Sequence, residues 1–141
     1  MSFVFNPFTG NFDSVTDPVE TPFTFTAGCQ SLDGVGDCVY VSGAAVDGVI
    51  QVAKVDITSA SKMPAIGIIT NKAGLTSCTV AFFGVVVLSV TTPGKVYFVG
   101  GDGKPNSTRP AGLVFIQSLG LALDETRLLL NPSMSMTKVL S

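Results

Sequence analysis

The sequence predicts an all-β fold: a compact β-barrel or β-sandwich with an extended N-terminal arm and a short C-terminal tail. Short apolar runs rich in Val, Ile, Phe and Tyr recur from about Gly28 onward, separated by Gly, Asp, Asn, Ser and Pro. No stretch shows the apolar spacing of an amphipathic helix. Six of the ten phenylalanines lie within the first 25 residues, and a chain of 141 residues suits one domain that carries such an arm.

The arm is predicted to span residues 1–26. Its apolar residues fit no helical stripe, and Pro7, Gly10, Pro18 and Pro22 interrupt any long strand. Burying one Phe side chain is worth roughly 1.5–3 kcal/mol, so several exposed ones would be costly. We therefore expect the arm to lie extended on a partner and to bind it through Phe3, Phe5, Pro7, Phe8 and Phe12. Phe23 and Phe25 belong either to this arm or to the first core strand.

The β-domain is predicted to span residues 27–132. Its strand candidates, in order, are 39–41, 49–55, 65–70, 79–90, 95–99, 113–123 and 127–130. Turn chemistry falls between them, at 47–48, 71–74, 93–94 and 100–103. Several runs are apolar on successive residues, which is typical of strands buried on both faces or covered by neighbouring subunits.

The domain contains a weak internal echo. Residues 36–43, GDCVYVSG, are similar to residues 94–101, GKVYFVGG, and a glycine-centred apolar segment follows each, at 65–68 and 118–121. Duplication and convergence on the same strand-and-turn pattern account for this equally well. In either case we expect Tyr40 and Tyr97 to occupy comparable strand positions, with their hydroxyls at the rim.

The tail, residues 133–141, is predicted either to fray or to serve as a second arm. Three of its apolar residues favour docking of the tail on a partner, because methionine adapts to irregular surfaces. These residues are Met134, Met136 and Leu140.

Composition argues against several chemistries. With no histidine in the chain, Ser-His-Asp and Cys-His catalytic arrangements cannot be built. Cys29, Cys38 and Cys78 are odd in number and lack CxxC spacing, which favours buried free thiols over disulfides or a zinc site. We assign no catalytic, cofactor-binding or metal-binding residue.

The remaining acidic and glycine-rich motifs are interpreted as turns. Asp33, Asp37 and Asp124 lie beside Gly or in short polar stretches, where Asp satisfies local backbone donors. The spacing of Asp33 and Asp37 does not fit a calcium loop. Residues 100–104, GGDGK, are predicted to be a hairpin tip, because a phosphate-binding loop would continue into Ser or Thr and a helix. The sequon at 106–108 is treated as loop chemistry.

Charge and hydropathy bear on partners and location. A net charge of −2 argues against a nucleic-acid binder. The longest apolar stretch, 78–90, is too short and too β-branched for a membrane-spanning helix. The start of the chain resembles no secretory signal, so we expect synthesis in the cytoplasm. Residues 1–53 carry six acids and no base, whereas residues 54–141 carry all eight bases. Either these halves pair within one fold, or the acidic half meets a basic neighbour.

Several short motifs occur in a familiar order. They are ASKMPAIGI at 60–68, GVVV at 84–87, TPGKVYF at 92–98, TRP at 108–110, IQSLGLAL at 116–123 and NPS at 131–133. Together they resemble a β-domain of tailed-bacteriophage structural proteins, found in capsid decoration or head-fibre proteins and in tail-fibre modules. The opening NPFTGNFD at 6–13 is similar to N-terminal peptides of phage virion components. The likeness covers about half the chain.

The resemblance implies a non-enzymatic structural protein of the virion. It would bind the outer surface of a phage head, as a cement or decoration protein, and stabilise adjacent subunits of the major capsid protein. We expect a homo-oligomer, dimer or trimer, with no cofactor, no nucleic acid and no membrane. An alternative is a tail-fibre or adhesin base module, and a remote one is a small carboxylate-dependent glycan-cleaving enzyme.

Overall fold

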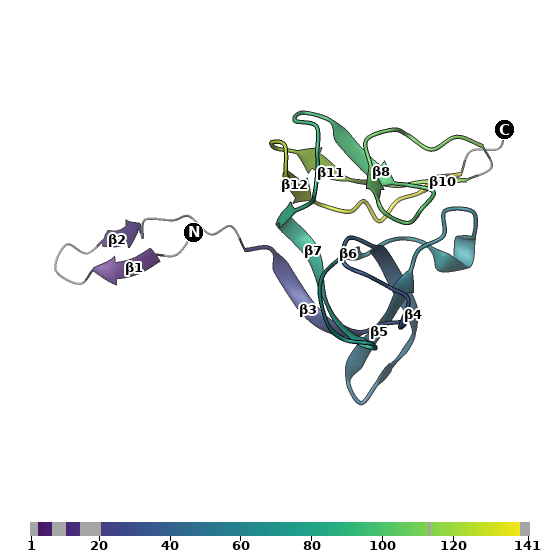
Figure 1. The fold of residues 1–141 in the computed structure, drawn as a ribbon, viewed down its shortest axis with the longest axis horizontal. Coiled ribbons are helices and arrows are strands. Elements are labelled where there is room, and N and C mark those ends of the chain that lie inside the picture. The colour runs from purple at the N-terminus through teal and green to yellow at the C-terminus, as the bar shows by residue number, and fades with distance from the viewer. Residues whose placement is uncertain (1–2, 7–10, 15–20, 113, 139–141) are drawn as a thin grey trace.

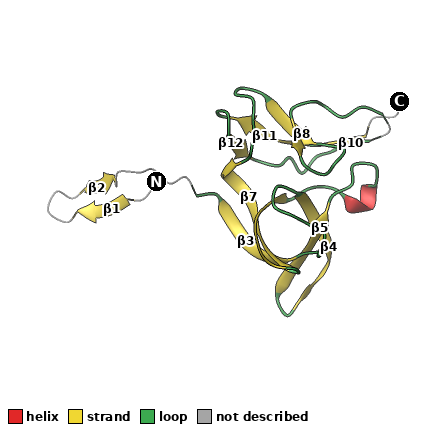
Figure 2. Ribbon diagram, viewed as in Figure 1, coloured by secondary structure: helices red, strands yellow, loops and turns green. Residues whose placement is uncertain are grey.

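The predicted all-β class is confirmed. The computed structural model describes residues 3–6, 11–14, 21–112 and 114–138, with side chains from residue 21 onward. Within these residues the chain consists of strands and loops, and its one helical turn is the 3-10 element η1 (Ala60–Lys62) (Figure 2).

The first half of the domain forms a closed five-stranded barrel. Each strand is hydrogen-bonded to the next in the order β3, β5, β4, β6, β7, and a β3–β7 pairing closes the ring. Of the two predicted architectures, barrel and sandwich, this half of the domain is a barrel. Its strands are β3 (Phe23–Gly28), β4 (Cys38–Val46), β5 (Val49–Lys54), β6 (Gly67–Gly74) and β7 (Ser77–Val87).

The second half forms an open sheet that shares β7 with the barrel. The order runs from β7 to β12 (Arg127–Leu130), β11 (Ser118–Ala122), β8 (Val96–Val99) and β9 (Pro105–Asn106). Figure 1 shows this sheet beside the barrel, with β7 passing from one to the other. Gly84 marks the transition: its φ is 104°, and a Cβ there would lie 3.1 Å from the Cα of Pro22. Only glycine adopts this conformation readily.

Two apolar cores hold the domain together. The barrel interior contains the buried residues Ala27, Cys29, Val39, Val52, Ile69, Cys78 and Val80. The larger core lies at the seam, where the outward side chains of Cys38, Ile68 and Ala81 meet the second sheet. The second sheet contributes Val86, Tyr97, Val99, Leu119, Leu128 and Leu130 to this seam core.

The sequence echo corresponds to two similar three-strand units. Strands β4, β6 and β7 are adjacent in that order, as are β8, β11 and β12. The middle strand of each unit carries a glycine with no room for a side chain. A Cβ on Gly67 would collide with the carbonyl oxygen of Ala81, and one on Gly120 with that of Leu129.

The expected equivalence of the two tyrosines is wrong. Gly67 is paired with Val39 and Gly120 with Tyr97, so Tyr97 corresponds to Val39 and not to Tyr40. A shift of one residue places a side chain on the other face of a strand. Tyr97 is buried, and its hydroxyl accepts a hydrogen bond from the Thr92 N–H at 2.9 Å.

The described residues of the N-terminal segment form two short paired strands. β1 (Phe3–Asn6) pairs antiparallel with β2 (Asn11–Ser14), and the hairpin lies apart from the barrel (Figure 1). Of the predicted arm residues, Phe3 and Phe5 lie on β1 and Phe12 on β2. Pro7 and Phe8 lie outside the described residues.

The boundaries of arm and tail also differ from expectation. β3 begins at Phe23, so Phe23 and Phe25 belong to the barrel, and the predicted boundary after residue 26 cuts through this strand. Part of the tail packs on its own domain: β13 (Thr137–Lys138) pairs with β10 (Phe115–Ile116), and Met136 packs against the seam core. Met134 is exposed, and Leu140 lies outside the described residues.

Most of the predicted turns are confirmed. Asp47 and Gly48 have φ of 52° and 77°, as a two-residue hairpin turn requires, and Gly94 has φ of 77°. The GGDGK segment is a hairpin tip closed by the Gly100 N–H, which donates to the Lys104 carbonyl at 2.8 Å. The turn expected at 71–74 is wrong. These residues belong to β6, whose irregular register absorbs them, and the chain turns at 75–76.

Candidate functional site: an aromatic cluster and two apolar cavities

The acidic loop between β3 and β4 is a pair of consecutive turns. The Gln30 N–H donates to the carboxylate of Asp33, and the Gly34 N–H to the carboxylate of Asp37, both at 2.8 Å. Asp124 likewise accepts from the N–H groups of Thr126 and Arg127. The turn roles that the sequence predicts for these three aspartates are confirmed.

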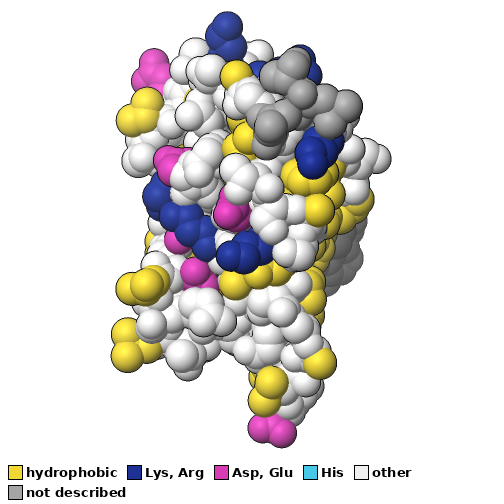
Figure 3. All heavy atoms as spheres, turned by 90° about the vertical axis from the view of Figure 1, so that its right-hand side faces the viewer, with side chains coloured by type: hydrophobic (Ala, Val, Ile, Leu, Met, Phe, Trp, Pro, Cys, Tyr) yellow, Lys and Arg dark blue, Asp and Glu magenta, His cyan; other side chains and the backbone are white. Residues whose placement is uncertain are grey.

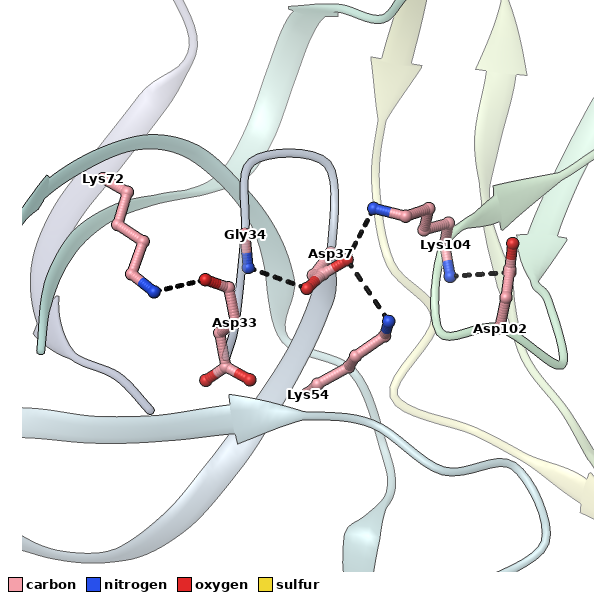
Figure 4. A network of polar contacts seen from close by, with 7 residues as sticks. All are labelled: Asp33, Gly34, Asp37, Lys54, Lys72, Asp102 and Lys104. Atoms are coloured by element: carbon pink, nitrogen blue, oxygen red, sulfur yellow. Dashed lines mark hydrogen bonds and ion pairs between the residues drawn. The ribbon is translucent and has the colours of Figure 1, made fainter. Parts of the chain in front are cut away.

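Lysines from the second part of the chain hold the loop in place (Figure 4). Lys72 Nζ donates to the carbonyls of Gln30, Ser31 and Asp33. Lys104 Nζ lies 2.7 Å from the carboxylate of Asp37, and Lys54 Nζ lies 3.6 Å from it. At Asp37, therefore, the acidic and basic halves of the sequence pair within one fold. Figure 3 shows a band of mixed charge across the middle of the face it presents.

The environment of Asp37 favours its charged form. Burial alone would raise its pKa, but hydrogen bonds from Lys104 and the Gly34 N–H, together with the charges of Lys104 and Lys54, lower the pKa below its ordinary value. The Lys104 ion pair thus fixes the loop to the second sheet, because Lys104 lies on the β8–β9 turn, whereas Lys54 ends β5 of the barrel. The loop presents Leu32 and Val35 to solvent, at 95% and 60% exposure.

An aromatic cluster stands on the surface where β3 meets β7. It consists of Phe23, Phe25, Phe82 and Phe83, with ring centroids 5.8–6.3 Å apart in the contacting pairs. This spacing is typical of favourable aromatic pairs. Phe23 is 64% exposed, and Phe82 and Phe83 are also exposed. A cavity of about 350 Å³ opens beside the cluster, lined by Phe25, Ile66, Phe82, Asn131, Pro132 and Met134.

A bulge explains why adjacent phenylalanines of β7 are both exposed. Phe23 is paired with Phe83 but Thr24 with Ala81, so Phe82 is an extra residue on β7. In a regular strand neighbouring side chains point to opposite faces, and the bulge breaks this alternation. In the sequence, the only sign of this cluster is the adjacent pair Phe82-Phe83. The bulge that exposes both side chains depends on how β7 pairs with β3, which the sequence of β7 alone does not show.

A second cavity, of about 610 Å³, lies along the seam between barrel and second sheet. Thr24, Ile68 and Thr70 line it from the barrel, and Val85–Val90, Tyr97 and Pro105 from the second half. Lys104 also lines it, but its amine is engaged by Asp37. The lining is mostly aliphatic.

Other features bear on the predicted chemistry. The three cysteines are free and buried, as expected. Within the described residues, no group of three or more His, Cys, Asp or Glu side chains is arranged to hold a metal ion. No helix in the described part of the chain has the length and hydropathy to cross a bilayer.

The predicted binding residues are brought together only in part. Met134 lies at the cavity beside the aromatic cluster, whereas Met136 belongs to the seam core. The aromatic cluster itself was not among the predicted binding residues. Comparison of the chain with protein-family models, with curated proteins and with solved structures found no match.

Proposed function

We propose that this chain is a non-enzymatic structural protein of a phage virion that binds the outer surface of the capsid and stabilises adjacent subunits of the major capsid protein. The phage assignment rests on the sequence resemblance described above. The binding role rests on the aromatic cluster. Phe23, Phe82 and Phe83 are exposed, so a free protein would keep three aromatic side chains in contact with water. Large exposed apolar patches of this kind mark interaction sites.

The cluster has the character of an interface hot spot. Aromatic side chains dominate binding energy when they fill pockets at the centre of an interface. The barrel holds Phe23, Phe82 and Phe83 on paired strands, so little conformational entropy is lost when they bind. An interface of standard size, on the order of 1,000–2,000 Å², would cover the cluster and the neighbouring cavity.

The arm and the cluster are adjacent along the chain. The Phe-rich residues 1–22 lead directly into β3, whose first residue is Phe23 of the cluster. An arm that reaches across a subunit boundary would therefore start from the bound patch. Two linked contacts raise the effective concentration of the second once the first forms. Because each copy favours the assembled lattice over free subunits, binding stabilises the shell by mass action.

The test uses capsids assembled without this protein. Adding the purified chain should decorate them and raise the temperature at which they release DNA. Exchanging Phe23 and Phe82 together for Ser should remove most of this binding. The matched control is Leu75→Ser, because Leu75 is 74% exposed on the β6–β7 turn, before the opposite end of β7.

Two outcomes would overturn the proposal. One is full decoration by the Phe23→Ser/Phe82→Ser protein, provided that it is folded. The other is heads that are equally heat-stable without the chain, in particles that no longer adsorb to cells. The second outcome favours the tail-fibre or adhesin alternative.

A further inference from the structure

Among the described residues, the last four residues of β7 (84–87) have a strand partner on one side only. Residues 84–87 pair with β12 on one side. The β3 pairing ends at Phe83 and the β6 pairing at Ala81, so no described strand pairs with the other side of residues 84–87. A strand edge of this kind is a template for another strand.

The groups that face this edge follow from the alternation of an antiparallel ladder. The Leu88 N–H donates to the Thr126 carbonyl at 2.7 Å, in register with the Val86–Leu128 pair. Backbone groups of Leu88 and Val86 therefore point toward β12, and those of Val85 and Val87 point away from it. The Val87 side chain is 75% exposed, as expected at an open edge.

Space is available beside the edge. The cavity of about 610 Å³ at the seam is lined by Val85–Val90 together with Pro22 and Thr24, so open space borders residues 85–87. An incoming strand would lie over aliphatic side chains and would exclude water from them.

The outer face of the second sheet is also apolar. Val96, Leu121, Leu129 and Val85 form one row across the four strands in direct register. The side chains of Val96, Leu121 and Leu129 are 46%, 40% and 38% exposed. The opposite face of the sheet buries Val86, Leu128 and Ala122 in the seam core. The row ends at the open edge, so a partner strand paired there would extend it.

We propose that the partner is a second copy of this chain, with two β7 edges pairing antiparallel about a two-fold axis at Val86. In this register Val85 of each copy faces Val87 of the other, and the two residues exchange backbone N–H···O=C bonds. The axis also joins the two apolar rows into one face. Self-association of this kind is separate from capsid binding, because it needs no other component.

Charge favours an identical partner over a charged one. A two-fold contact brings each charge near its own copy, so the surface around the axis must be close to neutral. The residues that face the edge are valines. The nearest charged side chain in the register, Arg127, forms an ion pair with Asp124 at 2.6 Å. Like-charge repulsion across the axis is thereby reduced.

The test measures the mass of the full-length chain by sedimentation equilibrium across a concentration series. The unchanged protein should form a concentration-dependent dimer. Val87→Lys places a charge beside the axis, opposite Val85 of the other copy, and Val87→Pro removes the edge-facing N–H without breaking a bond to β12. Both variants should weaken the dimer at least tenfold. Leu75→Lys is the control: Leu75 is 74% exposed on the β6–β7 turn, outside the cavity and the apolar row, and this variant should still dimerise.

Several results would overturn this assignment. The assignment is wrong if the unchanged protein is a monomer at every soluble concentration. It is also wrong if Val87→Lys dimerises with unchanged affinity. A dimer that deletion of residues 2–20 abolishes and Val87→Lys does not affect belongs to the arm. If the full chain is monomeric and that deletion creates a dimer, the chain's own N-terminal segment covers the edge. Far-ultraviolet circular dichroism confirms that each variant is folded.

Discussion

The barrel and the second sheet are built from similar three-strand units, yet one is closed and the other open. In the barrel, β3 and β5 flank the β4-β6-β7 unit and join to complete the ring. The β8-β11-β12 unit has only the two-residue strand β9 on its far side. Closure gives the first unit an interior core, whereas the second must bury its inner face on the barrel wall. The outer face of the second unit therefore stays exposed, as Val96, Leu121 and Leu129 show.

The largest expected effects come from the two packed glycines. Gly67→Ala and Gly120→Ala each force a methyl group into a backbone carbonyl, and each should cost about 3 kcal/mol or more in the free energy of unfolding. Urea denaturation followed by circular dichroism measures this cost. If the two units are equivalent, the losses should be similar.

Matched glycines serve as controls in both regions. A Cβ on Gly43 in the barrel or on Gly101 at the β8–β9 turn would meet no atom within 4 Å. Gly43→Ala and Gly101→Ala should therefore change stability by less than about 0.5 kcal/mol. A Gly120→Ala protein as stable as these controls would show that the second sheet lacks the tight packing of the barrel.

The next effect concerns the link between the two regions. Gln117 is 1% exposed, and its amide accepts from the Ala65 N–H and donates to the carbonyls of Ala65 and Ser133, at 2.7–2.8 Å. Gln117→Leu leaves the N–H and carbonyl of Ala65 buried without these partners, so we expect a loss of about 2–4 kcal/mol. Thermal and urea unfolding measure it.

The control for Gln117 is an exposed glutamine. The side chain of Gln30 is exposed and its loop contacts use the backbone, so Gln30→Leu should be nearly neutral. Equal stability of Gln117→Leu and Gln30→Leu would contradict the linking role.

Most strands of the domain could be predicted because apolar runs and turn residues are read from neighbouring positions in the sequence. Runs at 49–55, 79–90 and 127–130 correspond to β5, β7 and β12. The features that define the candidate surfaces are not local. The bulge at Phe82 and the open edge at Val85 and Val87 depend on which strands pair with β7, and pairing joins residues distant in sequence. The one-residue error at Tyr40 has the same origin.

A smaller effect concerns the ion pairs that hold the loop in place. Asp37→Asn removes the charge facing Lys104 and Lys54 and should cost about 1–2 kcal/mol at pH 7. The pKa of Asp37 is lower in the folded state than its unfolded value of about 3.9. Its contribution is therefore complete above about pH 5 and is lost as pH falls through the folded-state pKa.

The measurement for this pair is urea unfolding of both proteins from pH 7 to pH 3. The stability difference between the unchanged protein and Asp37→Asn should shrink on acidification. Some acid sensitivity remains in both, because the pKa values of Asp56 and Asp124 are also lowered in the fold. A difference that is constant with pH would contradict the charge interaction.

The native thiols report on the two cores separately, and the expected change in their labelling is the smallest of these effects. Cys38 lies in the seam core, and Cys29 and Cys78 lie in the barrel interior. Burial raises the pKa of Cys38, and burial together with a hydrogen bond to Cys29 raises that of Cys78 to about 12, so both should react slowly with a thiol reagent near pH 8. Cys29 is also buried, which shields it from the reagent. In Gly120→Ala the second sheet loosens first, so Cys38 should be labelled faster while the barrel thiols stay protected. Mass spectrometry of labelled peptides distinguishes them. Equal acceleration at all three sites would mean that barrel and second sheet open as one unit, because then the seam core and the barrel interior would share one unfolding step.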